Sequence, residues 1–99
     1  MYETVYNEAR SDELTGLLNR KYFYEALNNE YEKLGERQLS LILVSVDDVR
    51  LYNQLYGNKE GDIVLINVAR IMDDYVNTQG YTARLGGKEF GIIYQIMDL

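Results

Sequence analysis

Apolar side chains recur every three or four residues in four stretches of the chain, and this spacing is typical of amphipathic helices. The third stretch stops at Gly57, a residue type that commonly ends helices, and Asp62 is expected to open the fourth. The helices predicted from this pattern span residues 2–10, 20–36, 51–56 and 62–76.

A second pattern, short runs of apolar and branched side chains, predicts three strands. Residues 40–46 form the most apolar run and are expected to be a buried strand. Residues 81–84 and 89–96 flank Gly86-Gly87, which is typical of a hairpin turn. A strand, a helical crossover and a hairpin make a right-handed βαβ unit with one extra antiparallel strand, so the predicted fold class is α/β (α+β). If the last strand lies between the other two, the sheet order is 40–46, 89–96, 81–84.

Composition narrows the classes of function. The 99 residues carry a net charge of −6 without a basic run, which argues against a surface for nucleic acids or anionic membranes. The chain has neither cysteine nor histidine, so a bound metal would be an oxygen-preferring ion such as Mg²⁺. No apolar stretch reaches the roughly 20 residues that cross a bilayer, and no signal peptide is visible. We therefore expect one cytoplasmic domain that does not insert into a membrane through this chain.

The first candidate for a functional site lies where the strand at 40–46 ends. Asp47 and Asp48 follow that strand, and ligands of open α/β sheets bind at the carboxyl ends of strands. The hairpin turn is expected to reach the same edge and to bring Lys88 and Glu89 toward the two aspartates. In the alternative interpretation, Asp47 or Asp48 only caps the helix that follows.

Three stretches of the chain, in this order, resemble the signature blocks of GGDEF domains, the diguanylate cyclases. The stretches are DELTGLLNRKYF (12–23), SVDDVRLYNQLYGNKEGDIVL (45–65) and ARLGGKEF (83–90). The resemblance implies a nucleotidyl-cyclase palm-like fold with a βαββ core, in which residues 12–99 form a partial GGDEF domain and residues 1–11 a linker or signalling helix. It also implies an activity in which a dimer joins two GTP molecules into cyclic di-GMP with the help of Mg²⁺ ions.

The resemblance assigns the substrate contacts to particular residues. Asn53 and Asp62 match the guanine-binding positions, where a carboxylate accepts from the N1 and N2 groups of guanine and an amide completes the contact. Asp48, Val49 and Arg50 match the turn whose backbone amides hold phosphates, with Arg50 in place of the usual lysine. Without the resemblance, Asn53 is interpreted as a surface residue of its helix and Asp62 as a helix cap.

The metal positions depart from the family pattern. Ser45 stands where the family has its first metal-binding aspartate, and Lys88 replaces an acidic residue of the hairpin motif. Only the Val46 carbonyl, Asp47 and Glu89 remain as weak candidate ligands, so no cofactor is expected unless the protein is active and binds Mg²⁺. We therefore expect no catalytic activity. Lys88 is then either the result of drift at an unused site or a cation that holds the triphosphate itself.

Two further features depart from the family. The inhibitory motif for cyclic di-GMP falls on Asn77 and Gly80, and neither residue fits that motif, so no inhibitory site is expected. Family members continue beyond the position that corresponds to Leu99, and a later strand pairs with the one at 40–46. An open apolar edge is therefore expected there, and such edges tend to pair with another chain.

Together these features predict a regulatory GGDEF domain of bacterial cyclic di-GMP signalling. The domain is expected to bind GTP weakly or to form a homodimer, and to act with an upstream sensory module or a partner protein. Two alternatives remain at this point: an active diguanylate cyclase, and a structural fragment without a ligand.

Overall fold

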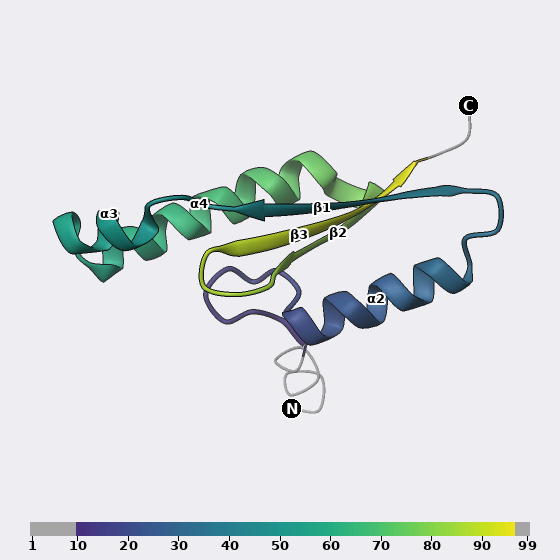
Figure 1. Cartoon of the computed structure of the whole chain (residues 1–99), viewed down its shortest axis with the longest axis horizontal. Helices are drawn as coiled ribbons and strands as arrows, with labels where there is room; N and C mark the ends of the chain where they lie inside the picture. The colour runs from purple at the N-terminus through teal and green to yellow at the C-terminus, as the bar shows by residue number, and fades with distance from the viewer. Residues whose placement is uncertain (1–9, 97–99) are drawn as a thin grey trace.

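The computed structural model describes residues 10–96, which form three helices, one 3₁₀ turn and three strands (Figure 1). The predicted helix at 2–10 lies almost entirely outside the described residues. The elements, in chain order, are α2 (Arg20–Glu32), β1 (Gln38–Ser45), α3 (Val49–Tyr56), α4 (Asn58–Val76), η1 (Asn77–Gln79), β2 (Gly80–Arg84) and β3 (Glu89–Ile96).

The three strands form one sheet in the order β1-β3-β2. Strand β3 is antiparallel to both neighbours, so β1 and β2 run in the same direction. The sequence made this order conditional on the last strand lying between the other two, and the structure meets that condition. The register pairs Ser45 at the end of β1 with Glu89 at the start of β3, which brings the end of β1 to the β2–β3 turn.

Helices α2 and α4 cover opposite faces of the sheet (Figure 1). Successive side chains of a strand point to opposite faces, so Phe90 packs toward α4, against Leu65 and Ala69. Ile93 points the other way and packs with Phe23 and Ala26 of α2. The core therefore has two halves, one on each side of β2 and β3.

Strand β1 differs from its prediction as a buried strand. It lies at one edge of the sheet, whereas the helices pack mainly over β2 and β3. Leu41 is 51% exposed and Leu43 is 68% exposed. An apolar run by itself cannot distinguish a central strand from an edge strand, and the position in the sheet decided the burial here.

Two helix boundaries also differ from the predictions. Helix α2 ends at Glu32 rather than near residue 36, and Gly35 follows with a positive φ of 56°. Helix α4 begins at Asn58 rather than at Asp62. Gly57 has a φ of 96° and is at once the residue after α3 and the residue before α4. Residues 58–61 are therefore helical, because one residue with positive φ is enough to redirect the chain between the two helices.

Candidate functional site

The sheet register brings two of the quoted sequence blocks together. The Val46 N–H donates to the Lys88 carbonyl at 2.9 Å, directly beyond the paired Ser45 and Glu89. The tip of β1, the β2–β3 turn and α3 lie at the same end of the sheet (Figure 1). The predicted approach of the strand end and the hairpin turn is therefore confirmed for the backbone. The side chains of Ser45, Lys88 and Glu89 are exposed there.

The turn between β1 and α3 leaves the start of the helix without a side-chain cap. Asp48 precedes α3 with φ 60°, in the left-handed region, and its carboxylate makes no capping hydrogen bond. The first helical bond runs from the Tyr52 N–H to the Asp48 carbonyl at 2.9 Å. Asp48 therefore occupies the N-cap position, as the alternative interpretation expected, but it caps α3 through its backbone carbonyl and not through its side chain.

Asn53 is held between α3 and α4 rather than on the surface of its helix. Its Oδ1 is buried and has no hydrogen-bond partner among the described residues. The amide rests on Gly61, which is buried, and a Cβ at Gly61 would overlap it. Burial of a polar oxygen without a partner is costly, which makes this atom a candidate for ligand contact. The interpretation of Asn53 as an ordinary surface residue is therefore wrong.

Asp62 follows Gly61 in the chain, so it lies next to the position that contacts Asn53. It is exposed and lies in the second turn of α4, not at the helix start. The interpretation of Asp62 as a helix cap is therefore wrong as well. The exposed Asp62 carboxylate is thus next in the chain to Gly61, against which the Asn53 amide packs. Two acceptors of this kind suit a ligand edge that carries several N–H groups.

Arg84 holds the hairpin turn through hydrogen bonds to its backbone carbonyls. Arg84 donates from Nε to the Gly86 carbonyl and from a terminal nitrogen to the Gly87 carbonyl, both at 3.0 Å. Its other terminal nitrogen lies 3.3 Å from the Asp12 carboxylate. Asp12 also accepts from the Thr15 N–H and hydroxyl. This network joins the loop before α2 to the turn that carries Lys88.

The electrostatics of Asp12 follow from this network. Partial burial alone would raise its pKa, but the hydrogen bonds from Thr15 and the charge of Arg84 outweigh the burial, so the pKa of Asp12 lies below its ordinary value. The predictions of the site did not include Asp12 and Arg84. Their presence in the first and third quoted blocks, 72 positions apart, was the available signal.

The donor set at the strand end does not fit a magnesium ion. Mg²⁺ in proteins takes one or two carboxylates together with phosphate and water oxygens. Here the carboxylates of Asp47 and Glu89 remain, but Ser45 supplies only a hydroxyl and the Lys88 ammonium group, next to Glu89 in the chain, repels a divalent cation. Across residues 10–96, no three acidic side chains form a group that could hold a metal ion. The residues at the strand end therefore do not suit a metal-assisted reaction.

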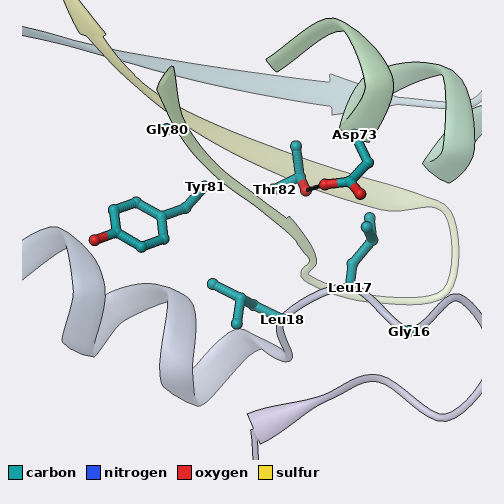
Figure 2. Close-up of a pocket in the computed structure, with 7 residues that line it drawn as sticks. All are labelled: Gly16, Leu17, Leu18, Asp73, Gly80, Tyr81 and Thr82. Carbon is teal, nitrogen blue, oxygen red and sulfur yellow. Dashed lines mark hydrogen bonds between the residues drawn. The ribbon is translucent and has the colours of Figure 1, made fainter. Parts of the chain in front are cut away.

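A pocket of about 230 Å³ lies elsewhere, between the loop before α2, the second half of α4 and the start of β2 (Figure 2). Its polar side chains have partners, because the Thr82 hydroxyl donates to the Asp73 carboxylate at 2.7 Å and the Tyr81 hydroxyl donates to Glu30 at 3.0 Å. The residues that line it are Gly16, Leu17, Leu18, Asp73, Gly80, Tyr81 and Thr82. The lining includes Gly80 of the expected inhibitory position but no basic side chain, so its charge does not suit an anionic ligand.

A smaller pocket of about 110 Å³ adjoins the strand end. Ser45 and Glu89 line its rim, and Leu43, Leu85 and Phe90 supply apolar walls. This hollow therefore adjoins Ser45 and Glu89, two of the residues that the sequence singled out.

Comparisons with known proteins bear on the whole chain. The family model described as "Diguanylate cyclase, GGDEF domain" matches residues 9–99. The chain is 33% identical over 96 residues to the diguanylate cyclase DgcS of Shewanella oneidensis, a match that covers 95% of the chain and 32% of DgcS. It is 41% identical over 90 residues to an uncharacterized membrane protein of Staphylococcus saprophyticus, covering 88% of the chain and 25% of that protein.

The solved structures include a similar fold. The crystal structure of the coiled coil and GGDEF domain of DgcB from Caulobacter crescentus, in complex with c-di-GMP, matches with a TM-score of 0.92 and 28% identity. The match covers 98% of this chain and 52% of that one. The predicted fold class is thus confirmed, and the chain spans only part of each of these relatives. Between residues 10 and 96, no helix has both the length and the apolar character needed to cross a membrane.

Proposed function

The chain belongs to the GGDEF domain family of diguanylate cyclases, and we propose that this protein is a regulatory member that binds GTP weakly without converting it. In this proposal it acts in cyclic di-GMP signalling in the cytoplasm, with an upstream sensory module or a partner protein. The observation that carries the proposal is the exchange of two acidic positions for Ser45 and Lys88 beside an intact pair, Asn53 and Asp62.

The proposed loss of activity rests on charge at the strand end. An ammonium group about 4 Å from a divalent ion is repelled by about 8 kcal/mol at an effective dielectric constant of about 20. Rotation of the Lys88 side chain and solvent relieve part of this repulsion, but the attraction of the missing carboxylate is lost in addition. Because a tenfold loss of rate needs only about 1.4 kcal/mol, these changes disfavour metal-assisted turnover strongly.

The proposed preference for guanine rests on the pair at α3 and α4. The Asn53 amide oxygen has no partner among the described residues and is able to accept a hydrogen bond from a ligand, as is the exposed Asp62 carboxylate. Guanine presents N–H donors at N1 and N2, whereas adenine presents an acceptor at N1. An adenine base would therefore leave the acceptors of this pair without donors, which costs binding energy.

Two measurements on one sample test the proposal. Purified protein is incubated with GTP and Mg²⁺ or Mn²⁺, and the products are separated by chromatography beside an active diguanylate cyclase. We expect no cyclic di-GMP, and its formation would contradict the proposal that the protein is catalytically inactive. Titration with GTP and with ATP is expected to show weak binding that favours GTP.

A pair of variants locates the guanine preference. Asp62→Ala is expected to remove the preference for GTP over ATP. Asp74→Ala is the matched control, because Asp74 is an exposed aspartate near the other end of α4. Equal binding of GTP and ATP by the unmutated chain would contradict the assignment of Asn53 and Asp62. The remaining alternative, a structural fragment without a ligand, predicts no binding of either nucleotide.

A second candidate role, self-association, is favoured by the outer edge of β1, which no other strand of residues 10–96 pairs with. In antiparallel pairing, alternate residues direct their N–H and C=O groups away from the neighbouring strand. The Val46 backbone N–H points to the strand β3 side, where it donates to the Lys88 carbonyl. The residues whose backbone N–H and C=O groups point away from β3 are therefore Leu39, Leu41, Leu43 and Ser45. Strand β1 carries no charged residue, so nothing in it opposes pairing with a second copy of the chain. We propose that this edge forms a homodimer.

A further inference from the structure

Two cationic side chains lie near the end of β1, where a metal site would need carboxylates. Lys88 is placed there by its backbone, because its carbonyl accepts from the Val46 N–H at 2.9 Å. Arg50 is the second residue of α3, four positions after Val46. Both side chains are exposed. The hydrogen bonds from Arg84 to the Gly86 and Gly87 carbonyls fix the turn that precedes Lys88.

Neither cation is neutralised by a neighbouring carboxylate. In the part of the chain that the structure describes, the ion pair joins Arg84 to Asp12, and neither Lys88 nor Arg50 takes part in one. This holds although Asp48 and Glu89 are close to them in the chain. The two charges are therefore available to an anion, and what distinguishes them from other exposed cations is their position at the strand end, where the Lys88 carbonyl accepts from the Val46 N–H and Arg50 lies in the first turn of α3.

We infer that Lys88, assisted by Arg50, takes the place of a metal ion in holding the phosphates of the bound nucleotide, so that GTP binds without Mg²⁺. This inference rests on the proposed binding of GTP at Asn53 and Asp62. An ammonium group is a compact charge that binds phosphate directly, and at this position it also repels a divalent cation. The preferred ligand is therefore free GTP, not its magnesium complex.

The direction of the magnesium effect separates this site from a metal-dependent one. Magnesium bound to the triphosphate lowers its negative charge and sets a second cation against Lys88. Added Mg²⁺ is therefore expected to weaken binding by about threefold or more, because it weakens the exposed charge pairs that Lys88 and Arg50 make with the phosphates, each of which contributes modestly. A site that uses the metal would show tighter binding in Mg²⁺.

The test is a titration of the whole chain with GTP, once in EDTA and once in Mg²⁺, followed by calorimetry or nucleotide fluorescence. Lys88→Gln is expected to weaken binding in EDTA about three- to fivefold and to reduce the effect of Mg²⁺. Lys88→Arg keeps the charge and is expected to retain the affinity. Lys33→Gln is the matched control, because Lys33 is an exposed lysine at the far end of α2.

Each outcome decides between the proposals. Binding in EDTA that weakens with Mg²⁺ and with Lys88→Gln, but not with Lys33→Gln, supports the inference. Binding that requires Mg²⁺, or that is unchanged in Lys88→Gln, overturns the inference and leaves the proposed GTP binding intact. Absence of GTP binding under both conditions overturns the proposed function together with the inference.

Discussion

At the scale of single residues, the Asn53 amide occupies the space that a Cβ at Gly61 would fill. Gly61 lies inside α4, where a glycine destabilises a helix by roughly 0.5–1 kcal/mol relative to alanine. The glycine leaves room for the Asn53 amide, which a Cβ would overlap. Gly61 therefore costs the helix some stability, and the Asn53 oxygen is buried without a hydrogen-bond partner. Both features are compatible with a ligand-binding role for the Asn53 amide.

Gly61→Ala is expected to separate binding from stability. The new Cβ displaces the end of a flexible side chain, and alanine favours the helix, so the free energy of unfolding is expected to change by less than about 1 kcal/mol. Binding of GTP is expected to weaken markedly, because Asn53 no longer occupies its place. Chemical denaturation and GTP titration of the same variant measure the two effects. A variant that binds GTP as well as the original chain would show that the Asn53 position is not needed.

At the scale of elements, Asp12 and Arg84 connect the loop before α2 to the hairpin turn. The pKa of Asp12 is lowered in the folded chain, so its ionised form stabilises the fold. That contribution is complete above the ordinary pKa of 3.8 and is lost as the pH falls through the lowered value. The turn that carries Lys88 is therefore expected to loosen in acid.

Asp12→Asn is expected to lower the free energy of unfolding at neutral pH by about 0.5–1 kcal/mol, the scale of a partly exposed ion pair. It is also expected to flatten the loss of stability below about pH 4, because the titrating group is gone. Denaturant unfolding at pH 7 and at pH 3 measures both effects. Glu13→Gln is the control, since Glu13 is an exposed neighbour in the same loop. An equal pH dependence in Asp12→Asn and the original chain would contradict this account.

At the scale of the whole molecule, the sheet has an apolar edge that the described residues leave open. Leu41 and Leu43 are both more than half exposed, and their backbone groups also point outward. Large exposed apolar patches commonly mark interaction sites. Pairing of two β1 strands across a two-fold axis would satisfy the backbone groups and cover both leucines.

If β1 pairs with a second copy as proposed, Leu43→Lys is expected to leave the chain monomeric, because a charge on an edge strand opposes strand pairing. Ile71→Lys is a closely matched control: Leu43 is 68% exposed and Ile71 on α4 is 69% exposed. Sedimentation velocity over a range of concentrations gives the oligomeric state of each chain. A folded monomer of the original chain at high concentration would refute self-association through β1.

The sequence by itself determined the approximate positions of the helices and strands, the hairpin and the family. Apolar spacing located the helices, and Gly86-Gly87 between two apolar runs identified the hairpin, because these signals depend on neighbours in the chain. The quoted blocks identified Asn53, Asp62, Ser45 and Lys88 as candidates before any contact was known. These signals are local, so they can be read without the fold.

Tertiary structure decided what depends on distant parts of the chain. Strand β1 is as apolar as a central strand, and only its edge position leaves Leu43 exposed. Asn53 is a polar residue on a short helix, and only the packing of α3 on α4 buries its oxygen. The pairing of Asp12 with Arg84 spans 72 positions, a separation at which local patterns carry no information on contact. Burial and long-range pairing are properties of the packed molecule, and they arise only when separate elements meet.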